Sequence, residues 1–286
     1  MNETLRTVDG RSVLRTERRL AHRPEKVWRA FTEPAHLTQW FPADMEMELR
    51  VGATVSFVFR DDEGPAMDGV VVELDPPRVF AYTWDDELLH WELRPDGEGC
   101  LLILTHTFDD RPGAASLATG WRVCLDALDM VLDGRPVQEP GNVVELHEAY
   151  VEAFGLNEGS SEVTPDGWRA RFERQLMHPI EAVWATLSAA SVPVVGGPAP
   201  QAFTTGSVPA GAVTAVEVPT LLEYDWLFEG RPGGRVRWEL SDGFGGARLV
   251  LSQTGLSEQA DERSTALAAW QTHIALLAKR LQFASR

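Results

Sequence analysis

The sequence predicts two tandem α+β domains, each built from a curved antiparallel sheet and one long C-terminal helix. Three observations predict this fold class: an internal repeat, a series of short strand-like segments in each half, and an amphipathic helix that ends each half. The repeat is clearest where residues 17–32 (ERRLAHRPEKVWRAFT) align without a gap with residues 173–188 (ERQLMHPIEAVWATLS). A repeat this long indicates a duplicated domain, because solenoid units have roughly 20–50 residues.

The similarity between the halves continues downstream. Residues 82–84 (YTW) and 91–93 (WEL) match residues 224–226 (YDW) and 238–240 (WEL), and Trp121 matches Trp270. We therefore predict a first domain at 12–134, an inter-domain helix and linker at 135–167, and a second, divergent domain at 168–286.

The elements of the first copy follow from local patterns. A helix is expected to begin at Arg23-Pro24-Glu25, because proline fits the first turn and an acidic residue there complements the helix dipole. Apolar residues recur at helical spacing over 116–132, which predicts a long amphipathic helix. Alternating and apolar runs predict the strands, and further patterns predict a short second helix at 37–41. The expected strands are 12–21, 54–59, 68–74, 79–84, 89–93 and 100–108.

The second copy repeats this order with one marked difference. The first copy has HLTQWF at 36–41, whereas the second has SVPVVGGPAP at 191–200, which cannot form a regular helix. A helix is expected at 142–154 between the copies, followed by a Gly- and Ser-containing linker at 155–167. The remaining expectations are helices at 179–188 and 264–283 and strands at 168–177, 212–218, 221–228, 235–240 and 247–253.

Composition excludes several classes of function. The 286 residues carry a formal net charge of −17, which argues against electrostatic binding to nucleic acid or to an anionic membrane surface. No segment approaches the ~20 apolar residues of a membrane span, and the N-terminus lacks a secretory apolar region. The two cysteines, Cys100 and Cys124, lie in apolar patterns and are expected to be buried free thiols. We therefore expect a cytoplasmic protein that binds neither nucleic acid nor membrane.

The sequence lacks the familiar catalytic motifs, including phosphate-binding loops, nucleophile elbows and zinc-binding helices. We expect no metal and no cofactor. The exception of interest is His106, which strand alternation places on one face with Leu102, Leu104 and Phe108. If the leucines face the helix, His106 looks into a cavity, where it binds a ligand polar group or acts as an acid/base. The alternative is a core histidine with an internal hydrogen bond. The second copy has Gln253 at this place.

Three segments carry a family resemblance. Residues 24–41 (PEKVWRAFTEPAHLTQWF) resemble the opening of an SRPBCC domain of the Aha type, named after the C-terminal domain of the heat-shock ATPase activator. Residues 91–108 and 120–128 are similar to a strand pair and the C-terminal helix of that family. The resemblance implies a helix-grip, START-like fold with an apolar cavity under the long helix. The family includes ligand carriers, cyclases, chaperone partners and self-resistance proteins, so the fold does not fix the function.

We expect the first copy to bind a small hydrophobic or aromatic molecule between the sheet and the C-terminal helix, and we expect a binding protein rather than an enzyme. The alternatives are a cyclase- or hydrolase-type enzyme that uses His106 as acid/base, a self-resistance protein, or a chaperone-interacting module. The chaperone-interacting alternative ranks low, because the eukaryotic activators carry a separate N-terminal domain, whereas the fold here is expected to begin already at residue 12. A homodimer stays open, and the second copy is either a packing partner or a divergent pocket. The residues expected to contact the ligand are Trp40, Phe57, Phe59, Tyr82, Trp84, Trp91, His106 and Trp121.

Overall fold

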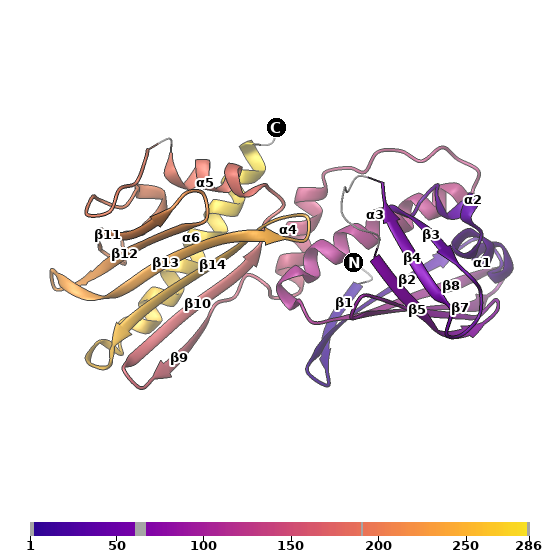
Figure 1. Ribbon diagram of the computed structural model, residues 1–286, viewed down its shortest axis with the longest axis horizontal. Helices are drawn as coiled ribbons and strands as arrows, with labels where there is room; N and C mark the ends of the chain where they lie inside the picture. Colours follow the sequence, from indigo (N-terminus) through magenta and orange to yellow (C-terminus); the bar gives the residue numbers. More distant parts are fainter. Residues whose placement is uncertain (1–2, 61–66, 190, 285–286) are drawn as a thin grey trace. The chain divides into compact units, whose positions relative to one another are not determined.

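The computed structural model describes residues 3–60, 67–189 and 191–284. The chain divides into two compact units, Met1–Val143 and Val144–Arg286 (Figure 1). Among the described residues, each unit has one antiparallel sheet, of eight strands in unit 1 and six in unit 2, together with one long C-terminal helix. The predicted fold class, two tandem α+β domains, is therefore confirmed.

Unit 1 begins with a hairpin and ends with a long helix. The strand order in its sheet is β1-β2-β8-β7-β6-β5-β4-β3, so the second strand of the unit pairs with the last strand of the unit. The two short helices stand between β2 and β3 in the chain. The elements are β1 (Glu3–Val8), β2 (Arg11–Leu20), α1 (Pro24–Thr32), α2 (Pro34–Leu37), β3 (Ala43–Met47), β4 (Thr54–Phe59), β5 (Met67–Asp75), β6 (Val79–Trp84), β7 (Glu87–Asp96), β8 (Gly99–Phe108) and α3 (Ala114–Leu132).

The core of unit 1 lies between its sheet and α3. Alternation along β8 buries Leu102, Leu104, His106 and Phe108 on the inner face, as the pattern predicts. The helix buries one side of its surface, which includes Trp121, Leu125, Leu128 and Leu132. These apolar side chains lose their contact with water together, and this burial is what holds the helix on the sheet.

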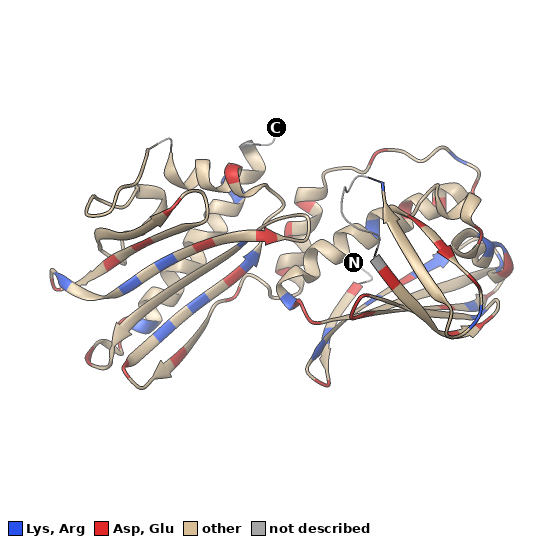
Figure 2. Cartoon of the chain, viewed as in Figure 1, with Lys and Arg blue, Asp and Glu red and all other residues tan. Residues whose placement is uncertain are grey.

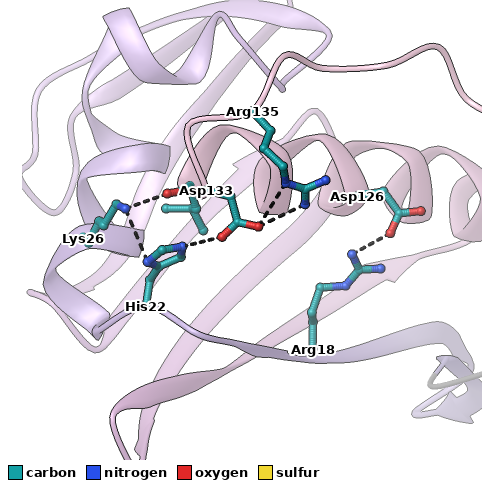
Figure 3. A network of polar contacts seen from close by, with 7 residues as sticks. Arg18, His22, Lys26, Asp126, Asp133 and Arg135 are labelled. Carbon is teal, nitrogen blue, oxygen red and sulfur yellow. Dashed lines mark hydrogen bonds and ion pairs between the residues drawn. The ribbon is translucent and has the colours of Figure 1, made fainter.

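A polar network fixes the C-terminal end of α3 (Figure 3). The Lys26 ammonium donates a hydrogen bond to the Leu132 carbonyl at 2.6 Å, so a cation satisfies a carbonyl of the last helical turn. His22 Nε2 lies 2.9 Å from Asp133, which also accepts from Arg135. Closer to the middle of the helix, Arg18 on β2 pairs with Asp126 at 2.6 Å. In unit 1, the Arg18 and His22 side chains of the repeated motif therefore serve to anchor the long helix.

Unit 2 has a shorter sheet in the order β11-β12-β13-β14-β10-β9. Figure 1 shows α6 running along one face of this sheet. The elements are α4 (Val143–Ala153), β9 (Ser160–Thr164), β10 (Gly167–Gln175), α5 (Ile180–Ser188), β11 (Ala210–Glu217), β12 (Leu221–Phe228), β13 (Arg231–Gly243), β14 (Gly246–Leu256) and α6 (Glu262–Ala284), with a short 3-10 turn at Gln201–Phe203.

Arg174, the counterpart of Arg18, takes its acidic partner from a different helix. Its side chain is only 5% exposed and pairs with Glu148 on α4. In α6, the places that correspond to Asp126 and Asp133 are held by Ala275 and Gln282. The predicted inter-domain helix thus supplies unit 2 with the carboxylate that its own long helix lacks.

The structure corrects several sequence-based expectations. The strand β1 pairs with β2 and precedes residue 12, where the fold was expected to begin. The strand β9, which pairs with β10, lies inside the segment expected to be a linker. A further strand, β3, was not predicted, and the short helix lies at Pro34–Leu37, earlier in the chain than the predicted 37–41. By contrast, 191–200 is not helical, as its prolines and glycines predict.

The outer face of the unit 2 sheet is a ladder of ion pairs. Figure 2 shows acidic and basic residues interspersed along β10 and β13. Arg171 pairs with Glu173 at 2.6 Å, and Arg237 pairs with Glu239 at 3.0 Å. Such exposed pairs each contribute little to stability, about 0–1 kcal/mol, and they keep this face of the sheet solvated.

Candidate functional site

The inner face of unit 1 carries a chain of three hydrogen-bonded side chains, Glu87, His106 and Trp121. His106 is fully buried, with Nε2 2.6 Å from Glu87 Oε2. Trp121 Nε1 on α3 donates to His106 Nδ1 at 3.0 Å. The strand register brings this set together, because Leu89, two residues after Glu87, lies opposite His106. These hydrogen bonds connect the partly exposed Glu87 carboxylate to Trp121 on the long helix.

The donor inventory fixes the role of each nitrogen of His106. An indole N–H can only donate, so Nδ1 accepts and the ring proton of the neutral imidazole lies on Nε2. Nε2–H then donates to Glu87, which acts as a carboxylate acceptor. Both nitrogens are therefore hydrogen-bonded inside the protein, which matches the alternative of a core histidine with internal partners.

The structure places the eight predicted ligand-contacting residues in one cluster of side chains. Trp91 is central, with ring centroids 6.2 Å from Trp40 and 5.4 Å from Trp121. Phe41 lies 6.1 Å from Trp121 and 6.4 Å from Trp84. Phe41 therefore joins the buried half of the cluster to Trp84, around which the predicted residues of β4 gather.

That second half of the cluster reaches the surface. Trp84 stacks with Phe57 at 5.5 Å and with Phe59 at 5.2 Å, with interplanar angles of 19° and 20°. Phe57 is fully buried, whereas Phe59 and Trp84 are partly exposed. Trp84 is also the hairpin partner of Glu87 in the register of β6 and β7. The partly exposed edge of the cluster therefore presents two stacked rings beside one carboxylate.

Tyr82 lies deeper, 5.7 Å from Phe57 between ring centroids. Burial raises the pKa of Tyr82 far above its ordinary value, and a hydrogen bond with Trp91 opposes this only in part. The phenol is therefore neutral at physiological pH. Its hydroxyl serves the core rather than acid–base chemistry.

Glu87 is the residue of this site that sequence reasoning missed. Asp85-Asp86-Glu87 resembles a solvated acidic turn, and the strand was expected to begin only at Leu89. The signal that could have identified Glu87 was strand alternation. Alternate strand residues point to the same face, so Glu87 shares the inner face with Leu89 and Trp91. Glu92, on the opposite face of the same strand, pairs with Arg94 at 2.7 Å.

Unit 2 keeps one half of the polar chain and lacks the other. Trp270 Nε1 donates to Gln253 Oε1 at 2.6 Å, so glutamine replaces His106 as the acceptor. The place of Glu87 is taken by Gly234, where an added Cβ would lie 2.0 Å from the Thr254 carbonyl oxygen. The counterpart of Trp84 is Trp226, which is buried and donates to that same carbonyl. No carboxylate can therefore be placed there.

The 3-10 turn that directly follows the differing segment 191–200 fills the interior of unit 2. Phe203 is fully buried, with its ring 5.3 Å from Trp184 and 5.6 Å from Trp238 between centroids. Its carbonyl accepts hydrogen bonds from the Tyr224 hydroxyl at 2.8 Å and from Trp238 Nε1 at 3.1 Å. The 3-10 turn is thereby tied to the inner face of the sheet, and the two units differ at the site itself.

Other reactive groups offer no second centre among the described residues. Burial raises the pKa of Cys100 to about 11 and that of Cys124 to about 12, so neither thiol is an activated nucleophile. No cluster of three or more metal-ligating side chains occurs in the part of the chain that the structure describes. No described helix is long and apolar enough to cross a membrane.

A groove of about 610 Å³ on the outer face of the unit 2 sheet is lined by arginines from β10 and β13. Arg169, Arg171 and Arg237 all line it, and each already pairs with a glutamate at 3.3 Å or less. Their charges are balanced inside the ladder of ion pairs. The groove is therefore a weaker candidate for a ligand site than the Glu87 edge of unit 1.

Comparison with known proteins gives a family. The family model described as "Activator of Hsp90 ATPase homolog 1-like protein" matches residues 21–133 and again residues 180–282. No curated protein matches the chain.

Several solved structures are similar to about half of the chain. A conserved protein of unknown function from Enterococcus faecalis, EF2215, is 22% identical, covers 54% of this chain and 90% of its own, and has a TM-score of 0.46. CalU16 from Micromonospora echinospora is 21% identical, covers 54% of this chain and 94% of its own, and has a TM-score of 0.43.

Proposed function

This chain belongs to the family of Activator of Hsp90 ATPase homolog 1-like proteins, with two copies of the domain, and from that premise we propose that its first unit binds a small, largely apolar or aromatic molecule. The observation that carries the proposal is the partly exposed Phe59–Trp84 stack beside Glu87. Exposed rings next to a fixed polar group are the usual makings of a small-molecule site, in which apolar walls supply affinity and few polar groups supply orientation.

The difference between the two units supports a single site. In unit 2 the counterpart of Trp84 is buried, and the place of Glu87 is a glycine. A duplicated fold needs neither an exposed tryptophan nor an inner carboxylate for stability, since unit 2 folds without them. These features of unit 1 are therefore best explained by ligand binding.

The geometry favours binding over catalysis at His106. General acid–base catalysis needs a ring nitrogen within reach of the substrate. Here Nδ1 is used by Trp121 and Nε2 by Glu87, and the ring is fully buried. We assign His106 the task of holding Glu87 in place.

The proposal is tested by saturation-transfer NMR of a neutral aromatic probe, 1-naphthylmethanol, with the full-length protein. We expect binding to the native protein and its loss in Trp84→Ala, because the stacking surface is removed. Phe59→Ala removes the other ring of the same stack and should also weaken binding. The matched control is Trp226→Ala in unit 2, which should leave binding unchanged. The proposal would be refuted if Trp84→Ala and Trp226→Ala weakened probe binding equally, or if the native protein did not bind the probe.

A further inference from the structure

We propose that the ligand of unit 1 carries a cationic or N–H-donating group next to its apolar ring, and that Glu87 receives that group. The inference rests on the proposed function, since it names the chemical class of ligand for the same site. It is carried by the Glu87 carboxylate, its fixed orientation and its ring neighbours.

Glu87 is held in place as a hydrogen-bond acceptor with free acceptor sites. Because Trp121 must donate to Nδ1, the His106 proton lies on Nε2 and points at Glu87 Oε2, 2.6 Å away. Glu87 is thereby held as an acceptor. A carboxylate has two oxygens and about four lone-pair sites, and among the described residues the one hydrogen-bond partner of Glu87 is His106. The side chain is 33% exposed, so the remaining acceptor sites are within reach of a ligand.

The charges around Glu87 are mainly negative. The hairpin next to Glu87 contains Asp85 and Asp86. The neighbouring cation, Arg11, is engaged elsewhere: its guanidinium pairs with Asp109 at 2.7 Å and donates to the Asp86 carbonyl at 2.8 Å. Glu87 therefore lies in an acidic environment, and among the described residues no lysine or arginine pairs with it. A ligand cation gains from this field, whereas a ligand carboxylate is repelled.

An aromatic ring, that of Trp84, neighbours Glu87. Trp84 and Glu87 face each other across the hairpin, and the Phe59 ring stacks on Trp84. An aromatic ring attracts a cation through its quadrupole and an apolar ring by stacking. A planar amine therefore satisfies both halves of the site at once: its ring contacts Trp84 and Phe59, and its ammonium reaches Glu87.

The test compares three probes that share one ring: 1-naphthylmethylamine, 1-naphthylmethanol and 1-naphthylacetate, titrated into the full-length protein by calorimetry. We expect the amine to bind about tenfold more tightly than the alcohol and the acetate to bind most weakly, because a charge-assisted hydrogen bond is stronger than a neutral one. Glu87→Gln, which keeps the shape and an acceptor for His106, should bring the amine down to the affinity of the alcohol.

The matched control is Glu92→Gln, which changes the same residue type on the same strand but on the opposite face, where Glu92 pairs with Arg94. It should leave all three affinities unchanged. If amine and alcohol bind equally to the native protein, or if the preference survives Glu87→Gln, the ligand class is wrong while the site stands. If none of the probes binds the native protein, the proposed function fails with it.

Discussion

His106 stabilises unit 1 chiefly as the buried acceptor for Trp121. In His106→Leu the Trp121 N–H keeps no partner in the core, which costs about 1–3 kcal/mol. Glu87 also loses a partner but is 33% exposed, so water replaces that bond at little cost. Burial of the leucine side chain offsets part of the loss. We expect unit 1 to lose about 1–2 kcal/mol of its free energy of unfolding.

His106→Gln provides the matched comparison, because unit 2 uses that solution: Gln253 accepts from Trp270 at 2.6 Å. This variant should lose less than about 1 kcal/mol, since the buried donor keeps an acceptor. The assay is urea unfolding of the full chain followed by circular dichroism, with the transition of unit 1 identified by its shift. A native-like His106→Leu, or a His106→Gln as unstable as His106→Leu, would refute the reasoning.

Two further predictions concern the charged residues that anchor the helices. Glu148→Ala should destabilise unit 2 by about 3 kcal/mol in the same assay, because Arg174, whose side chain is 5% exposed, then keeps an unpaired buried charge. Asp126→Ala should cost unit 1 less, because the Asp126 side chain is 43% exposed. Equal losses of stability in the two variants would contradict this. The hydrogen bond with His22, and then that with Arg135, holds the pKa of Asp133 below its ordinary 3.8, so its stabilisation is full above that value and disappears as the pH falls through the folded pKa. Asp133→Asn should therefore weaken the dependence of melting temperature on pH below about pH 5, and an unchanged dependence would exclude this role.

Much of the fold was predictable because its strongest signals are periodic. The stripes of apolar residues that end each half predict α3 and α6, and the repeated Arg and His mark where the first strand leads into the first helix. The strands that escaped prediction are those with weak patterns. The exposed edge strand β9 buries no side chain, so alternation leaves no trace in its sequence. In β3 the sequence ADMEM is rich in residues that are depleted in strands.

The site was predictable for its rings but not for its carboxylate. Large aromatics in adjoining strands and in the facing helix were expected to converge, and the structure places them together. Glu87 could not be assigned, because its importance depends on where the β6–β7 hairpin turns. Trp84 opposite Glu87 fixes that register, and only this register turns the acidic side chain toward His106. Likewise, the partner of Arg174 comes from α4, a segment outside both repeats, so comparison of the repeats could not supply it.

The central claim is that this duplicated protein has one ligand site, at the Glu87 and Trp84 edge of unit 1. Native mass spectrometry of the full chain titrated with 1-naphthylmethylamine tests it most directly. We expect saturation at one non-covalent adduct per chain, which is lost in Trp84→Ala and retained in Trp226→Ala. Saturation at two adducts per chain, or an adduct that persists in Trp84→Ala, would contradict it.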